Sequence, residues 1–185
     1  MGDAISSESY TPRQRTTYRR RLEDELERFD RHLQGAEFVD HGTIGLELEL
    51  NLVDDAMRPH PNNQAVLELL DDEYQSEIGA YNVEMNHPPL SIAGDGLARL
   101  AEGVAERLAI VRNAAEKAGS HLAMVGTLPT MSSQFLDSEK WMTRENRYRA
   151  LSNSVIEARG ELVRIDIARD EHYDHEFDDI APESA

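Results

Sequence analysis

The sequence predicts an α+β fold, in which an antiparallel or mixed sheet carries its helices on one face. Two kinds of segment lead to this prediction. Two stretches alternate apolar and polar residues with the period of a half-buried strand, and longer stretches around them have helical spacing. A strand with one apolar and one polar face belongs to a sheet covered on one side only, which argues against a doubly covered parallel sheet.

Residues 43–53 form the clearest strand in the sequence. Leucine recurs at every second position on one face, while Glu47, Glu49 and Asn51 fall on the other face. We therefore expect the leucines to lie in the core and the two carboxylates to lie on the uncovered face of the sheet.

A second strand is predicted over residues 80–86. Val83 and Met85 share one of its faces, and Glu84 lies on the other. The sequence His-Pro-Pro follows, and because proline has no N–H to donate within a sheet, it predicts the end of this strand.

The remaining elements follow from apolar spacing and from glycine and proline positions. In the helix over residues 63–74, we expect Val66, Leu69 and Leu70 to face inward. The acidic residues after position 168 predict a mobile tail. The predicted helices are 11–35, 63–74, 95–119 and 144–158, and the further strands are 121–127 and 161–168.

Composition excludes several classes of function. The 185 residues include no cysteine, so disulfides, thiolate metal sites and cysteine nucleophiles play no part. A net charge of -17 argues against a nucleic-acid partner. The sequence has no apolar run of the roughly 18 residues that a membrane helix needs, and no apolar leader at its N-terminus. We therefore expect a cytoplasmic protein with no membrane or nucleic-acid partner.

The two acidic strand faces raise a question of charge. If the strands pair, Glu47, Glu49 and Glu84 come close together, and like charges at short range are costly unless a cation lies among them. Magnesium suits such a site because it prefers oxygen ligands and shares its shell with phosphate groups. The alternative is that these glutamates are ordinary solvent-facing positions on a one-sided sheet, and periodicity alone leaves both interpretations open.

Two motifs bear a resemblance to a known family. TIGLELELNLVDD resembles the opening strand of the glutamate-cysteine ligase superfamily, in its carboxylate-amine ligase branch, where a G-x-E-x-E strand supplies magnesium ligands. EIGAYNVEMNHPPL resembles the second motif of that branch, and GTLPT and ENRYRALSNSVIEARGE are similar to further family segments. The resemblance covers residues 40–185.

The resemblance implies a fold, a reaction and a set of ligands. The fold would be a glutamine-synthetase-like curved sheet around a site for ATP and Mg²⁺. The family's reaction would join a glutamate-like carboxylate to an amine such as that of cysteine, through an acyl phosphate. By the family motifs, Glu47, Glu49 and Glu84 would bind the metal, and Glu77 would be a further ligand. The partners would thus be small-molecule substrates.

The same resemblance sets the predicted domain limits. Residues 1–10 are expected to be disordered, residues 11–40 to form the amphipathic helix and a linker, and residues 41–185 to form the N-terminal part of a ligase-like catalytic domain. The chain is shorter than the family's enzymes, so we expect an incomplete sheet. An unpaired sheet edge and exposed apolar surface then predict either self-association, for example as a homo-oligomer, or poor solubility.

Some positions depart from the family pattern or remain ambiguous. Leu128 in GTLPT stands where many members of the branch have histidine, so a truncated or non-catalytic domain that binds a ligand or partner is the alternative function, and a plain structural interaction domain is a third. Arg147, Arg149 and Arg164 could bind phosphate or a substrate carboxylate, although arginine is also common on solvent-facing helix and strand surfaces.

Overall fold

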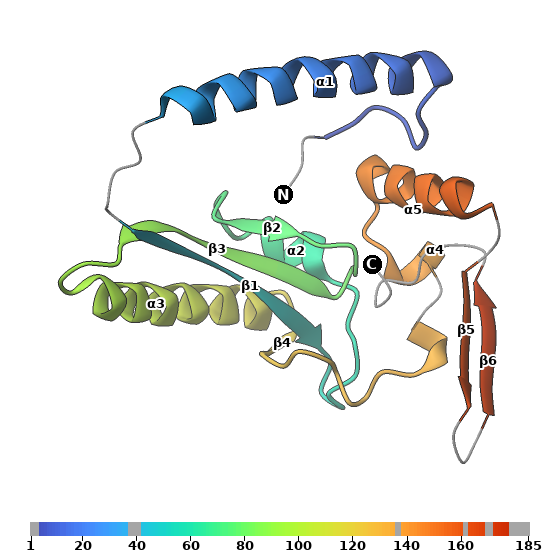
Figure 1. Cartoon of the computed structure of the whole chain (residues 1–185). Coiled ribbons are helices and arrows are strands. Elements are labelled where there is room, and N and C mark those ends of the chain that lie inside the picture. Colours follow the sequence, from blue (N-terminus) through green and yellow to red (C-terminus); the bar gives the residue numbers. More distant parts are fainter. Residues whose placement is uncertain (1–3, 37–41, 136–137, 161–162, 169–171, 178–185) are drawn as a thin grey trace.

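A four-stranded antiparallel sheet, which is not closed into a barrel, forms the centre of the molecule (Figure 1). The strand order is β2-β3-β1-β4. The two long central strands are β1 (Thr43–Val53) and β3 (Asn82–Ser91), and the short outer strands are β2 (Tyr74–Ser76) and β4 (His121–Ala123). This computed structural model describes residues 4–36, 42–135, 138–160, 163–168 and 172–177.

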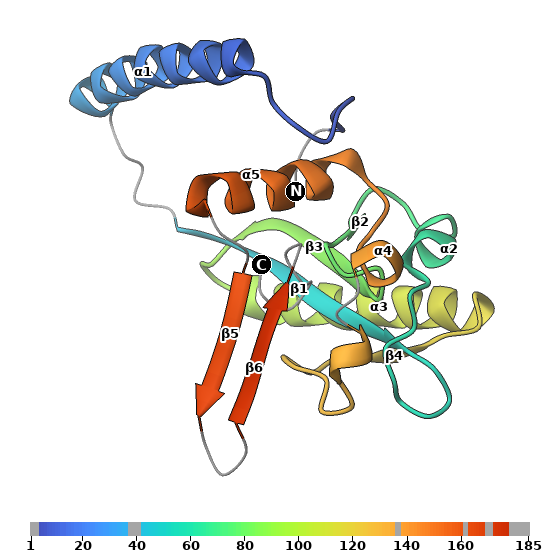
Figure 2. The same cartoon turned by 90° about the vertical axis from the view of Figure 1, so that its right-hand side faces the viewer.

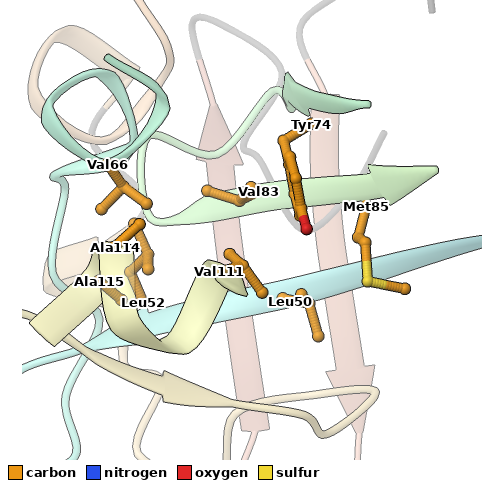
Figure 3. Close-up of a cluster of buried hydrophobic side chains, with 9 residues drawn as sticks. All are labelled: Leu50, Leu52, Val66, Tyr74, Val83, Met85, Val111, Ala114 and Ala115. Carbon is orange, nitrogen blue, oxygen red and sulfur yellow. The ribbon is translucent and has the colours of Figure 1, made fainter. Parts of the chain in front are cut away.

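Two helices cover one face of the sheet. They are α2 (Asn63–Leu67) and the long helix α3 (Gly96–Lys117). Shortly after the end of α3, Gly119 adopts a φ of 80°. Between them and the sheet lies the main core, to which alternate residues contribute in one part of each central strand, from Leu48 to Leu52 in β1 and from Val83 to Met85 in β3. Figure 3 shows its nine buried members, which are Leu50, Leu52, Val66, Tyr74, Val83, Met85, Val111, Ala114 and Ala115.

A second apolar cluster packs near the far end of β1. Val53 and Tyr81 contact Leu128, Phe135 and Trp141, all of which are buried. Phe135 belongs to a 3₁₀ turn (Ser133–Phe135), and Trp141 belongs to α4 (Ser138–Trp141). Their rings pack edge to face, with their centroids 4.8 Å apart. This cluster fixes the chain that returns from β4 towards the other side of the sheet.

The helix α5 (Asn146–Arg159) lies on the opposite side of the sheet from α3 (Figures 1 and 2). Near it runs α1 (Pro12–Gly35), which begins with a capping box between Thr11 and Gln14 and buries none of its residues. An ion pair between Arg15 and Glu157 joins the two helices. Within the described residues, no helix is long and apolar enough to cross a membrane.

The predicted α+β class and the antiparallel sheet are confirmed, and so are the strand over 43–53 and the long helices near 12–35 and 96–117. The predicted end of the second strand is wrong. β3 continues through Pro88 and Pro89 to Ser91, because the pairing with β1 shifts between Ile44 and Leu46. The two prolines therefore fall at a β-bulge, where no ladder hydrogen bond is required of them.

The predicted helix over 63–74 is also wrong in extent. The helix ends at Leu67, Leu69 is 53% exposed, and Tyr74 already belongs to strand β2. Tyr74 is drawn into the sheet because its ring fills the core and its hydroxyl donates to the Arg107 carbonyl oxygen at 3.0 Å. Tertiary packing thus outweighs the helical spacing of this stretch.

The described part of the strand predicted over 161–168 is a strand, but it lies outside the main sheet, and residues 161 and 162 lie outside the described residues. The strand β5 (Val163–Ala168) pairs antiparallel with β6 (His172–Phe177) in a separate two-stranded sheet. The prediction of a mobile tail after position 168 missed β6, because its acidic composition concealed a strand. The strand predicted over 121–127 is likewise shorter than expected, since β4 ends at Ala123.

Candidate active site on the acidic face of the sheet

A row of polar side chains crosses three strands on the face opposite α3. Glu49 of β1 and Glu84 of β3 are direct partners in the antiparallel register, and Gln75 of β2 is the partner of Glu84 on its other side. The next pair along β1 and β3 is Glu47 with Asn86. The register therefore brings together the glutamates that the sequence placed on separate strands.

Burial differs sharply along this row. Glu84 is only 6% exposed, whereas Glu47 and Glu49 are exposed. The Asn86 side-chain amide donates to Glu84 Oε1 at 2.8 Å, which satisfies one of the buried carboxylate's oxygens. Glu84 is thus the fixed centre of the row, and the two exposed glutamates beside it are free to change rotamer at little cost.

The fourth predicted ligand, Glu77, lies just after the end of β2 and is hydrogen bonded through its side chain to Glu84. Burial, together with this hydrogen bond and the negative charge of Glu84, raises the pKa of Glu77 to about 7. The negative charge of Glu49 acts in the same direction. Glu77 therefore keeps its proton to a higher pH than an isolated glutamate, because its charged form is disfavoured beside a second carboxylate in a partly desolvated place.

The carboxylates of this row are of the ligand type that hard divalent cations prefer. Glu49 is the register partner of Glu84, and its negative charge also acts on Glu77. In the described part of the chain, no group of three or more His, Asp or Glu side chains already has the spacing of a metal shell. A metal ion bound at this place would require Glu47 or Glu49 to turn towards Glu77 and Glu84.

Two asparagines close the row on the side of β4. Asn51 and Asn82 are register partners, and the Asn82 amide donates to Asn51 Oδ1 at 3.0 Å. The Asn51 amide in turn donates to the Val125 carbonyl oxygen at 3.0 Å. These bonds hold the loop after β4 against the acidic face, next to the carboxyl groups.

The three arginines considered as phosphate ligands lie in different places. Arg147 points inward: its Nη2 donates to Ser76 Oγ at 2.7 Å, and its Nε lies 2.8 Å from Glu145 Oε2. Arg149 is half-buried on the same helix. Arg164 belongs to β5, so the structure does not bring it into the sheet that carries the acidic row. Phosphate binding by these arginines stays a prediction.

Leu128 is buried, with 5% of its surface exposed, in the apolar cluster around Trp141. The position where many members of the branch have histidine is therefore a packing position in this chain. A polar side chain placed there would lose its hydration among apolar neighbours.

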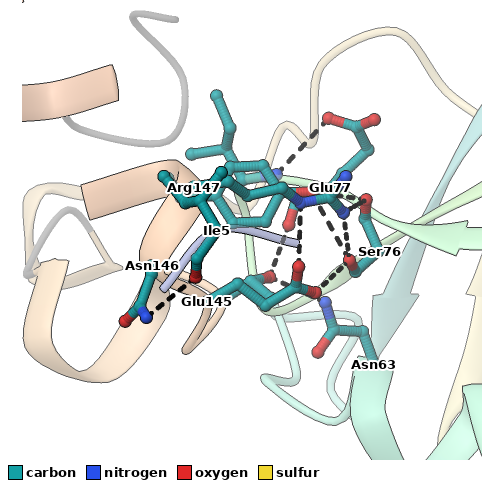
Figure 4. Close-up of polar contacts among 10 residues, drawn as sticks. Ile5, Asn63, Ser76, Glu77, Glu145, Asn146 and Arg147 are labelled. Carbon is teal, nitrogen blue, oxygen red and sulfur yellow. Dashed lines mark hydrogen bonds and ion pairs between the residues drawn. The ribbon is translucent and has the colours of Figure 1, made fainter. Parts of the chain in front are cut away.

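Sequence reasoning missed a group of polar residues beside Glu77. They are Ser76, Thr143, Glu145 and Tyr148, and Figure 4 shows part of the network that they form. The only signal in the sequence was the alternation in YQSE, which is too short to distinguish a strand from the end of a helix. Their partners lie more than 60 positions apart in the sequence, so local patterns could not connect them.

One of three comparisons with known proteins found a match. The searches of curated proteins and of solved structures found no match. A family model, Glutamate-cysteine ligase family 2 (GCS2), matches residues 43–179, a span that begins with β1 and includes the whole acidic row. Membership of this family supports ligase activity in general and small-molecule substrates. The chain therefore belongs to glutamate-cysteine ligase family 2.

Proposed function

We propose that this chain carries the magnesium-binding face of an ATP-dependent ligase that forms a γ-glutamyl-type amide bond. The observation that carries the proposal is the hydrogen-bonded pair of Glu77 and Glu84, with Glu49 beside it, in a member of a ligase family. Glu84 is buried and Glu77 is half-buried beside it, and a bound cation would offset the repulsion between two carboxylates in such a place.

The proposed reaction has two steps. In the first, the γ-carboxylate of a glutamate-like substrate attacks the terminal phosphorus of ATP, giving an acyl phosphate and ADP. In the second, an amine such as that of cysteine attacks the acyl carbon, the C–O bond to phosphate breaks, and the amine loses a proton as the amide forms. Glu49, Glu77 and Glu84 would hold Mg²⁺, whose positive charge would offset the negative charge that develops during phosphoryl transfer.

The residues of the chain would act by holding and orienting. Glu84 is fixed by burial and by Asn86, and Glu77 would give up its proton when a cation binds. Glu49 and Glu47 would turn in from the exposed end of the row to complete the ligand set. The same proposal includes the small-molecule substrates and a cytoplasmic location where ATP and Mg²⁺ are available. It also includes residues 41–185 as the N-terminal part of a ligase-like catalytic domain.

The test is a titration of ATP into the chain in the presence of Mg²⁺, with two matched variants. Glu84→Gln keeps the shape of the buried side chain and removes its charge, and we expect it to weaken magnesium-dependent ATP binding at least tenfold. Glu102→Gln changes an exposed glutamate of α3, on the other face of the sheet, and should leave binding unchanged. Equal affinity in both variants would count against the proposal.

A second candidate is a domain of the same family that binds nucleotide or a partner without turnover. The observation that favours it is Leu128, which is buried in an apolar cluster where the branch often has histidine. Release of ADP with glutamate and an amine decides between the two. ADP production that depends on both substrates supports the ligase, and ATP binding without any ADP production supports the second candidate.

A further inference from the structure

The backbone of residues 76–78 is hydrogen bonded to the segment that leads into α5 and to the first turn of that helix. The Tyr148 hydroxyl donates to the Ser76 carbonyl oxygen at 2.6 Å, and the Thr143 hydroxyl donates to the Glu77 carbonyl oxygen in a short hydrogen bond. The Thr143 backbone N–H donates to the Ile78 carbonyl oxygen at 2.7 Å. Three successive carbonyl groups thus each accept a hydrogen bond from residues 143–148. We call residues 143–148 the clamp.

Side chains strengthen the same connection (Figure 4). Arg147 Nη2 donates to both Ser76 Oγ, at 2.7 Å, and the Ser76 carbonyl oxygen, at 3.2 Å. The Ser76 hydroxyl donates to Glu145 Oε1 at 2.5 Å. The Arg147 guanidinium also pairs with Glu145 and stacks on the Tyr148 ring, 4.6 Å from its centre. The donors that a phosphate ligand would use therefore face the end of β2.

The clamp is shielded from water. Ser76 and Tyr148 are each 8% exposed, and Thr143 is 2% exposed. Hydrogen bonds in such places are costly to leave unmade, because the stranded partner has no water to replace it. Burial also raises the pKa of Tyr148 to about 12, so its hydroxyl keeps its proton and remains a donor throughout the physiological range.

Glu77 depends on this clamp for its position. The pairing of β2 with β3 covers only Tyr74 to Ser76, so the ladder stops one residue before Glu77. Beyond that point, the Thr143 hydroxyl donates to the carbonyl group of Glu77 itself. The Glu77 side chain extends from this fixed backbone to Glu84. A shift of the backbone by even a fraction of an ångström would change the distance between the two carboxyl groups.

We propose that Thr143, Arg147 and Tyr148 are positioning residues that hold the carboxylate of Glu77 beside that of Glu84 for binding of a divalent cation. This assigns Arg147 a role behind the site, in place of the phosphate contact that its sequence context suggested. The inference rests on the proposed metal site at Glu77 and Glu84, and it names residues outside the ligand set that determine the affinity of that site.

The test is a double-mutant cycle on cation affinity, measured with Mn²⁺ by electron paramagnetic resonance. Tyr148→Phe removes one buried hydroxyl and keeps the ring, and we expect the dissociation constant for Mn²⁺ to rise about three- to tenfold. In a Glu77→Gln background, the same substitution should have no further effect, since the group that the clamp positions is then absent. An equal effect in both backgrounds would overturn the positioning role.

A second pair of variants guards against a general loss of structure. Thr143→Val removes the hydroxyl with little change in shape, whereas Thr143→Ser keeps a donor for the Glu77 carbonyl group. We expect the dissociation constant for Mn²⁺ to stay within about twofold of the wild-type value in Thr143→Ser and to rise about tenfold in Thr143→Val. If Val and Ser weaken binding equally while both remain folded by circular dichroism, Thr143 does not act through its hydroxyl.

The outcomes separate the two claims. Wild-type binding that Glu84→Gln abolishes, together with no effect of the clamp variants, would retain the proposed metal site and reject the clamp. No Mn²⁺ binding by the wild-type chain at millimolar concentration would reject both. The inference is supported only if Tyr148→Phe weakens Mn²⁺ binding in the wild-type background and has no effect on it in the Glu77→Gln background.

Discussion

Glu49 of β1 is the direct cross-strand partner of Glu84 on β3, so two acidic side chains occupy opposite positions in the centre of the sheet. Like charges in this arrangement disfavour the pairing. The register is nevertheless fixed, because Leu50 and Val83 are partners on the other face and are completely buried in the core. The hydrophobic core thus holds the acidic row together against its own repulsion.

This relationship predicts opposite effects of one substitution on stability and on binding. Glu49→Gln removes a repulsive charge, so the metal-free protein should gain about 0.2–1 kcal/mol in its free energy of unfolding. The same change should weaken Mn²⁺ binding, since a carboxylate ligand is lost. Urea unfolding and paramagnetic resonance measure the two quantities. A loss of stability in Glu49→Gln would mean that the charge is not under repulsion in the free protein.

The pKa of Glu77, which is raised from 4.5 to about 7, predicts a pH dependence of the metal-free protein. A group whose pKa is higher in the folded state contributes most to stability below its unfolded pKa, and the contribution is lost as the pH rises through the folded value. Stability from Glu77 should therefore fall between pH 4.5 and pH 7.

Glu77→Gln provides the control for this titration, because its neutral amide has no proton to lose. We expect the difference in unfolding free energy between wild type and Glu77→Gln to change by about 1–2 kcal/mol over that interval, after allowance for solvent screening. Denaturant unfolding at several pH values, with a chelator present, measures it. A difference that stays constant with pH would show that Glu77 titrates normally.

Leu128 should be important for stability, because it is 5% exposed within the cluster around Trp141. Leu128→Ala is expected to lower the free energy of unfolding by about 2–4 kcal/mol. Met124→Ala, at a side chain that is 60% exposed, should change it by less than about 0.5 kcal/mol. Urea unfolding of both variants checks this prediction, and equal effects would place Leu128 outside the core.

Self-association remains a prediction, and α1 offers a surface on which to test it. Leu26 and Phe29 lie on one side of this helix and are 58% and 57% exposed. Replacing both with glutamine should shift the chain towards monomer in analytical ultracentrifugation, because apolar contact area is lost. A wild-type chain that sediments as a monomer at all concentrations would contradict the prediction.

The sequence was most informative where periodicity is long and strict. Eleven residues of alternating pattern sufficed to predict β1 and the face on which Glu47 and Glu49 lie, and helical spacing predicted α3. Periodicity predicts which residues share a face of one helix or strand, because side-chain direction follows directly from backbone geometry.

What the sequence could not supply is pairing between distant elements. Strand β2 has only three residues, and its place in the sheet depends on the burial of Tyr74 in a core built by other segments. The clamp joins residues 76–78 to residues 143–148, and Glu77 and Glu84 come from different parts of the chain. Contacts of this kind depend on tertiary packing, which overrides local propensity.

The most direct test of the central claim is calorimetric titration of the chain with ATP, with and without Mg²⁺. If the acidic row forms a cation site for a nucleotide, ATP should bind only when Mg²⁺ is present, and protons should be released near pH 7 as Glu77 gives up its proton. Binding that is equally strong without Mg²⁺, or no heat under either condition, would contradict the account.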